Sequence, residues 1–187
     1  MLEILKKLLV SGEAALIYTD DQNTSKFHYG IICGVNDTEV SINMFNQSGN
    51  YDGIIMISSD IVYRIEIDGQ YHKKMEKLCS NTTKSFERLN NDNIKNSLLN
   101  LALETQKIVS LELMNSGCYD IVGFVSNLND HICQIKVIDE YGLEDGKAFI
   151  LTEGITKICY DSEDENNIFK LWEINRNTRN TGDGSAC

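Results

Sequence analysis

Hydrophobic positions along the chain follow two different periods, and each change of period marks a boundary between a helical and an extended segment. Leucine and isoleucine recur at helical spacing over residues 2–9 and 92–103, which predicts an amphipathic helix in each place. Apolar and polar residues alternate over residues 40–44 and 133–137, which predicts strands that are buried on one face. The other predicted strands and tail helices lie at residues 15–18, 29–35, 54–58, 61–67 and 71–78 of the first half and at residues 108–113, 121–128, 147–151, 155–160 and 168–174 of the second.

The two halves of the chain are copies of one pattern. When the sequence is shifted by 93 positions, residues 29–78 fall on residues 122–171 without a gap, and twelve of the fifty pairs are identical. Average residue usage predicts roughly three identities over this length. We therefore interpret the chain as a duplication and predict four segments. These are a first repeat at residues 1–80, a polar linker at 81–91, a second repeat at 92–174 and a disordered tail at 175–187.

Each repeat contains one helix followed by about five short strands, and this content favours a particular architecture. A flat sheet of short strands leaves long unpaired edges, which invite aggregation. Closure into a small barrel removes most of that edge and buries the apolar face. We therefore predict a mainly β fold with helices, of the α+β class, built from two tandem small barrels that are each preceded by a helix.

The order of turn and strand residues resembles that of the Sm-like fold, a subtype of the SH3-like barrels. In Sm proteins a glycine of the second strand precedes an Asp-containing hairpin turn and an alternating third strand. The matching residues are Gly30, Asn36-Asp37 and Val40-Ser41-Ile42 in the first repeat, and Gly123, Asn129-Asp130 and Ile132-Cys133-Gln134-Ile135 in the second. The resemblance implies a helix and five bent strands in each repeat.

The residues by which Sm proteins hold uridines are not repeated here. Those proteins carry an asparagine after the turn and an Arg-Gly or Lys-Gly pair between the last two strands. The equivalent positions are Ser41 and Gln134 for the asparagine, and Ser58-Ser59 and Leu151-Thr152 for the basic pair. The resemblance thus implies the fold without its RNA pocket, and Sm-like RNA binding remains an alternative function. Because Sm proteins assemble through strand edges, oligomerisation is a further expectation.

The charge of the chain affects which partner is expected. Its formal net charge of −11 repels nucleic acid phosphates and favours another protein as partner, a basic protein included. No apolar run approaches the roughly 20 residues that span a bilayer, so we expect no membrane segment. Lys6 and Lys7 lie inside the apolar pattern of the first helix rather than before it, which is not typical of a signal peptide. We therefore expect a cytoplasmic protein.

Metal, cofactor and catalytic motifs are not evident. The six cysteines include no CxxC pair, so we interpret them as free buried thiols and expect neither a metal nor a cofactor. Cys33 and His28 are near each other in sequence, but Cys33 shares a strand face with Ile31, so a core thiol is the better interpretation. We expect no catalytic residue and no enzyme, and an uncharacterised hydrolase is the second alternative.

Exposed acidic and aromatic residues are the remaining candidates for an interface. Tyr51 stands in a predicted turn between two glycines, and the Asp-Gly pairs that begin at Asp52 and Asp145 repeat, although turn chemistry also explains such pairs. The second repeat adds an acidic run, interpreted as a solvated loop. The candidate interface residues are Tyr51, Asp52, Asp145, Glu163, Asp164 and Glu165. We expect a non-enzymatic protein-binding module, either an adaptor or an inhibitor of the immunity type.

Overall fold

The computed structural model describes residues 1–79 and 88–182 and has a mixed α+β fold. The chain forms two compact units, Met1–Leu98 and Leu99–Cys187. Strands are antiparallel within each unit, so the predicted α+β class is confirmed. Most of the predicted linker at 81–91 and the last five residues of the chain lie outside the described residues.

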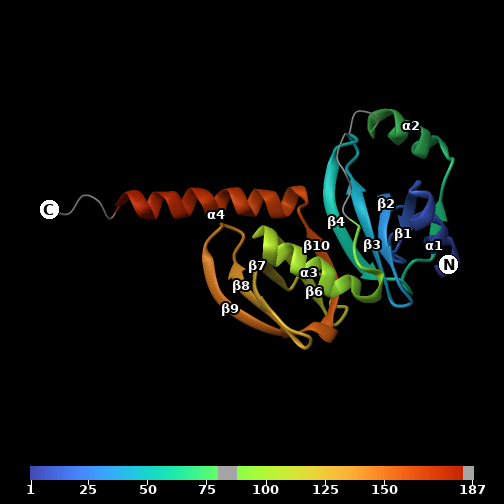
Figure 1. Ribbon diagram of the computed structural model, residues 1–187. Coiled ribbons are helices and arrows are strands. Elements are labelled where there is room, and N and C mark those ends of the chain that lie inside the picture. Colours follow the sequence, from blue (N-terminus) through green and yellow to red (C-terminus); the bar gives the residue numbers. More distant parts are fainter. Residues whose placement is uncertain (80–87, 183–187) are drawn as a thin grey trace. The chain divides into compact units, whose positions relative to one another are not determined.

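The first unit contains strands in the order β5-β1-β2-β3-β4. Figure 1 labels β1 to β4 of this order. Its strands are β1 (Ala14–Tyr18), β2 (His28–Val35), β3 (Glu39–Phe45), β4 (Tyr51–Ser58) and β5 (Arg64–Glu66). Helix α1 (Leu2–Ser11) precedes the strands and α2 (Gln70–Cys79) follows them. The short helix η1 (Asn91–Asn93) then leads into α3 (Ile94–Thr105), within which the boundary between the units falls.

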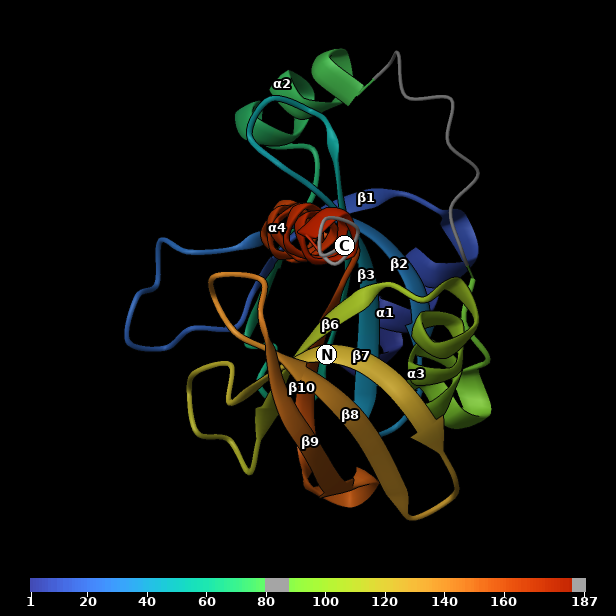
Figure 2. The same ribbon diagram turned by 90° about the vertical axis from the view of Figure 1, so that its left-hand side faces the viewer.

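The second unit repeats this arrangement in the order β10-β6-β7-β8-β9. Its strands are β6 (Ile108–Leu113), β7 (Ile121–Leu128), β8 (Ile132–Ile138), β9 (Glu144–Leu151) and β10 (Ile155–Tyr160). The short helix η2 (Thr152–Gly154) joins β9 to β10, and the long helix α4 (Glu163–Gly182) follows. Figure 2 shows β8 and β9 as a curved hairpin.

Neither sheet closes on itself. In the parts of the chain that the structure describes, β5 is not paired with β4 in the first unit, nor β10 with β9 in the second. The closing strand of the first unit, β5, is only three residues long and offers few hydrogen-bonding groups for closure. The two closed barrels predicted from the sequence are therefore not confirmed.

The duplication extends to the irregularities of the two sheets. Each unit has a register shift in the pairing of its second and third strands, and another in the pairing of its third and fourth strands, at positions 93 apart. The shifts lie at Ile32/Gly34 and Asn43/Phe45 in the first unit, and at Val125/Asn127 and Lys136/Ile138 in the second. Because a β-bulge bends and twists its strand, the two sheets share their curvature as well as their strand order.

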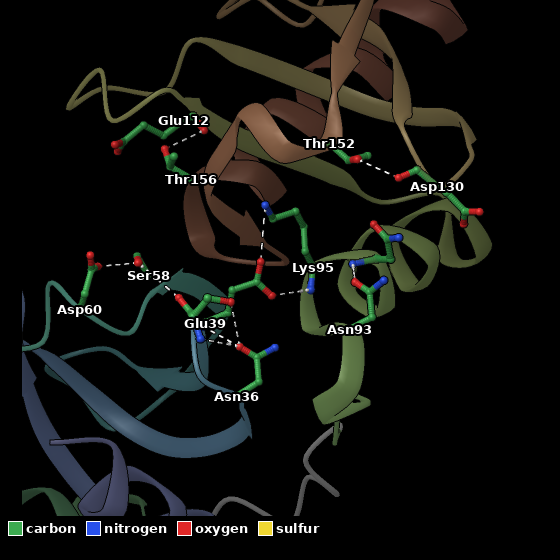
Figure 3. Close-up of polar contacts among 12 residues, drawn as sticks. Asn36, Glu39, Ser58, Asp60, Asn93, Lys95, Glu112, Asp130, Thr152 and Thr156 are labelled. Atoms are coloured by element: carbon green, nitrogen blue, oxygen red, sulfur yellow. Dashed lines mark hydrogen bonds and ion pairs between the residues drawn. The ribbon is translucent and has the colours of Figure 1, made fainter.

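The predicted Asn-Asp turns are present in both units and are held in the same way. The Asn36 side-chain oxygen accepts hydrogen bonds from the backbone amides two and three residues later, at 3.0 and 2.7 Å (Figure 3). Asn129 does the same at 3.0 and 2.8 Å. Asparagine favours such turns because its side chain reaches its own backbone.

One repeated glycine permits close contact between adjacent strands. A Cβ atom on Gly30 would lie 2.2 Å from the backbone oxygen of Asn43, and one on Gly123 would lie 2.1 Å from that of Lys136. Both distances are far below van der Waals contact, so only glycine fits without displacement of the neighbouring strand. The identity found in the sequence shift thus has a steric cause.

Helix α4 corrects the prediction for the end of the chain. The sequence pattern placed a short helix at residues 168–174 and a disordered tail at 175–187, whereas α4 continues to Gly182. No proline or glycine interrupts the stretch before that residue, and polar side chains are tolerated on an exposed helix. The Asn175 amide also donates a hydrogen bond to the Tyr141 backbone oxygen at 2.9 Å, which ties this part of the helix to the β8–β9 turn.

Candidate functional site

The structure does not gather the six candidate interface residues into one site. Tyr51 and Asp52 lie half-buried at the start of β4 in the first unit, and the Tyr51 ring packs edge-on against Phe45. Asp145 is exposed in β9 of the second unit. Helix α4 begins with the acidic run, Glu163 to Glu165, which the sequence interpretation had placed in a solvated loop.

Glu165 is buried, with 3% of its surface exposed, and its role is structural. Its carboxyl accepts hydrogen bonds from the Ser162 backbone amide at 3.1 Å and from the Ser110 hydroxyl at 2.6 Å, and the Ser162 hydroxyl bonds it as well. Serine at a helix start with glutamate three residues later has the spacing of a capping box, and the bond from the Ser162 amide to Glu165 is the half of it that the glutamate makes. The spacing of Ser162 and Glu165 is a sequence signal for this motif, although it lies within the acidic run. Because Glu165 is buried, it is not part of an exposed interface.

The described cysteines are free, but not all are buried. Cys33, Cys133 and Cys159 are buried as expected, and burial raises the pKa of the Cys133 thiol to about 11. That thiol therefore stays protonated at neutral pH and is a poor nucleophile. Cys118, by contrast, is exposed in the loop between β6 and β7.

A cavity of about 830 Å³ lies beside α4 in the second unit. Phe124 and Phe169 pack against Trp172 with ring centroids 4.8 and 5.7 Å away, and the Arg176 guanidinium lies 5.2 Å from the Trp172 ring. Of the hydroxyls in its lining, that of Ser126 donates to a backbone oxygen at 3.1 Å. The described lining contains no histidine or cysteine, so the cavity has an aromatic floor without a serine–histidine or cysteine–histidine pair.

A second feature of the same unit is a patch of exposed apolar side chains around β9. The β9 patch consists of Met114, Ile132, Phe149 and Leu151, which are 78%, 40%, 70% and 57% exposed. Met114, Phe149 and Leu151 line one cavity of about 580 Å³, and Ile132 lies opposite Leu151 in the β8–β9 pairing. Contiguous exposed apolar side chains on a water-soluble surface mark an interaction site more often than scattered single ones do.

The backbone at Met114 is held in an uncommon conformation. Met114 and Asn115 both have positive φ angles, 53° and 57°, in the left-handed region that residues with a side chain rarely adopt. The Met114 amide donates a hydrogen bond to the Gly154 backbone oxygen at 2.9 Å, which ties this strained loop to η2 beside the patch. Strain of about 1–3 kcal/mol per residue collects at binding sites, where the surrounding structure maintains it.

Acidic residues are concentrated in the unit that carries the β9 patch. Residues 99–187 contain fifteen acidic and seven basic residues, a net charge of −8, whereas residues 1–98 contain thirteen and ten, a net charge of −3. Glu153 lines the cavity of the patch, and Asp145 is exposed at the other end of β9. The cavity of the patch thus has an acidic side chain in its lining, and the net negative charge of the unit attracts cationic partners.

No group of three or more His, Cys, Asp or Glu side chains lies close enough to hold a metal ion within residues 1–79 and 88–182. Over the same residues, no helix is both long and apolar enough to cross a membrane.

Comparison of the chain with protein-family models, with curated protein sequences and with solved structures gives no match in any of the three. The geometry and charge of the site therefore carry its interpretation.

Proposed function

We propose that the chain is a non-enzymatic protein-binding module that binds its partner through the β9 patch. The observation that carries the proposal is the exposure of four neighbouring apolar side chains, three of which line one cavity. Interfaces have an apolar centre with a polar rim, and Met114 and Phe149 are of the residue types enriched there. The acidic surroundings supply such a rim and favour a basic partner.

The proposal extends to fold and location. We assign each repeat to an Sm-like module, since both units place strands in the same order after a helix and share their bulges and turns. We assign the protein to the cytoplasm, where thiols stay reduced, because the described cysteines form no disulfide. An adaptor and an inhibitor of the immunity type both fit a module that acts by binding alone.

Affinity purification of the tagged chain from its source cell tests the proposal when the unsubstituted chain is compared with two single-residue variants. Phe149→Ser removes the centre of the β9 patch, and Val10→Ser removes an apolar side chain that is 83% exposed on α1 of the other unit. We expect a stoichiometric, nuclease-resistant protein that the unsubstituted chain and Val10→Ser retain and that Phe149→Ser loses.

Other outcomes contradict the proposal in different ways. A partner that all three proteins retain equally would show that binding does not use the β9 patch. Recovery of RNA that is released by moderate salt, with no protein partner, would support the Sm-like RNA-binding alternative instead. Because Phe149 is 70% exposed, its truncation is not expected to unfold the chain, and circular dichroism checks this directly.

A further inference from the structure

Strand β9 is an outer strand whose two halves differ in their protection. Natural edge strands avoid unwanted pairing through charged residues, bulges or short length. The first half of β9 has such protection, with Glu144, Asp145, Lys147 and a glycine at φ 82°. Its second half, Ala148 to Leu151, consists of four consecutive apolar residues with no charge.

The backbone of β9 is paired along one edge only. Its pairing with β8 runs from Ile138↔Glu144 to Ile132↔Leu151, and β9 is the last strand of the order in the described residues. The outward amide and carbonyl groups of the strand are therefore directed away from the sheet. An extended peptide can use such groups for main-chain hydrogen bonds while its alternate side chains enter a pocket.

The β9 patch supplies the pocket for these alternate side chains. Phe149 and Leu151 are two residues apart and so project from the same face of the strand. The cavity of about 580 Å³ that they line with Met114 lies at this unprotected half. Methionine adapts its shape to different apolar groups, which suits a pocket of this kind.

Charge decides between two possible occupants of the edge, a second copy of this chain and a basic partner. Two copies would each bring a net charge of −11, and the unit that contains β9 alone carries −8, so self-pairing is opposed by repulsion. A lysine- or arginine-bearing strand would instead place cations near Asp145 and Glu153. The charges thus favour a different, basic protein.

We infer that β9 accepts an extended basic segment of the partner as an added strand, with the partner's apolar side chains in the β9 patch. The inference rests on the proposed function and specifies how the partner is bound. Main-chain pairing gives the segment its direction and register, the cavity selects apolar side chains at alternate positions, and the acidic surface selects against an acidic segment.

Synthetic peptides test the strand addition without knowledge of the natural partner. The probe is a peptide of eight residues, the length of β9, in which lysine and valine alternate. One control replaces two of its valines by proline, which removes two N–H donors and keeps all four lysine charges. A second control alternates glutamate and valine. Binding to the full chain is measured by isothermal titration and by hydrogen exchange at β9.

We expect the lysine peptide to bind, to bind less tightly as salt is added, and to slow amide exchange in β9. The proline and glutamate peptides are expected to bind at least about tenfold more weakly. Phe149→Ser should weaken binding of the lysine peptide to a similar degree, whereas Val10→Ser should not. Leu151→Ser provides a second variant of the same patch.

Two results would overturn the strand addition. Equal binding of the lysine and proline peptides would show that no main-chain pairing occurs, and unchanged β9 exchange with bound peptide would show that the peptide lies elsewhere. Either result is compatible with a cellular partner that depends on Phe149, so the proposed function can survive the loss of this inference. If peptides add to β9 but no cellular partner depends on Phe149, the proposed function fails while the strand addition stands.

Discussion

Replacement of the buried Glu165 by alanine should destabilise the second unit by removing the acceptor at the start of α4. The Glu165 carboxyl receives a hydrogen bond from the Ser162 amide at 3.1 Å and one from the Ser110 hydroxyl at 2.6 Å. The first bond caps the helix, and the second joins the helix to β6. Both bonds are lost together in Glu165→Ala.

The magnitude follows from these two groups. Loss of a helix cap costs about 0.5–2 kcal/mol. The Ser110 hydroxyl, which is 4% exposed, would lose its acceptor, and a buried donor without a partner costs about 1–3 kcal/mol. We therefore expect Glu165→Ala to lower the free energy of unfolding of this unit by about 1.5–5 kcal/mol.

Trp172 gives a direct assay, because it is the single tryptophan of the chain and lies on α4. Urea unfolding followed by its fluorescence reports the release of α4 from the sheet, and far-ultraviolet circular dichroism reports the loss of secondary structure. The matched control is Asp164→Ala, one residue earlier on an exposed position of the same turn. It removes an acidic charge near the helix start, which is worth at most about 1 kcal/mol.

A double substitution separates the two contributions. Ser110→Ala combined with Glu165→Ala removes the hydroxyl together with its acceptor, so the combined loss should be smaller than the sum of the two single losses. If Glu165→Ala costs no more than Asp164→Ala, the buried hydrogen bonds do not stabilise α4 and the reasoning fails.

Three other predictions address packing, thiol reactivity and pH. Gly123→Ala should lower the free energy of unfolding by about 1–3 kcal/mol or more, because its Cβ would lie 2.1 Å from a backbone oxygen. Gly154→Ala, whose Cβ would have its nearest atom at 3.5 Å, should be tolerated. Urea unfolding of the two variants compares their stabilities. Cys118 should react with iodoacetamide in the folded chain while Cys133 stays unmodified until unfolding, as peptide mass spectrometry can establish, and equal rates would contradict the assigned burial. Burial, followed by smaller effects of nearby acidic groups, raises the pKa of Tyr29 from 10.0 to about 12. The neutral phenol therefore stabilises the fold below pH 10, and this contribution is lost as the pH rises to 12. Tyr29→Phe should lose less stability than the unsubstituted chain between pH 10 and 12, and an identical loss would refute the assigned cause.

The local parts of the fold were predictable because short sequence signals specify them. Asn36 and Asn129 form turns through their own side chains, so their conformation depends on a few neighbouring residues. The repeated Gly49 and Gly142 have φ angles of 80° and 75°, which only glycine adopts readily. The duplication strengthened each of these predictions by presenting the same signal twice.

The features that the sequence did not reveal depend on contacts between distant segments. Alternation predicts which strand face is apolar but not whether another element covers it, so the exposure of Phe149 could not be foreseen. Closure into a barrel depends on pairing between the outer strands, which alternation does not encode. The burial of Glu165 had a local signal in its capping box, but its second partner, Ser110, is 55 residues away in the sequence.

The buried Glu165 also affects how a chain with two similar halves avoids exchanging parts between them. Tandem copies risk misassembly during folding, when a segment of one copy docks on the other. In the pairing registers, the position that Ser110 occupies beside β7 is filled beside β2 by the apolar Leu16. Docked on the wrong sheet, α4 would keep the hydrogen bonds from Ser162 but would bury the Glu165 carboxyl against a leucine in place of the Ser110 donor, at a cost of about 1–3 kcal/mol. The hydrogen bond between Glu165 in the first turn of α4 and Ser110 in β6 thus favours docking of this helix on its own sheet.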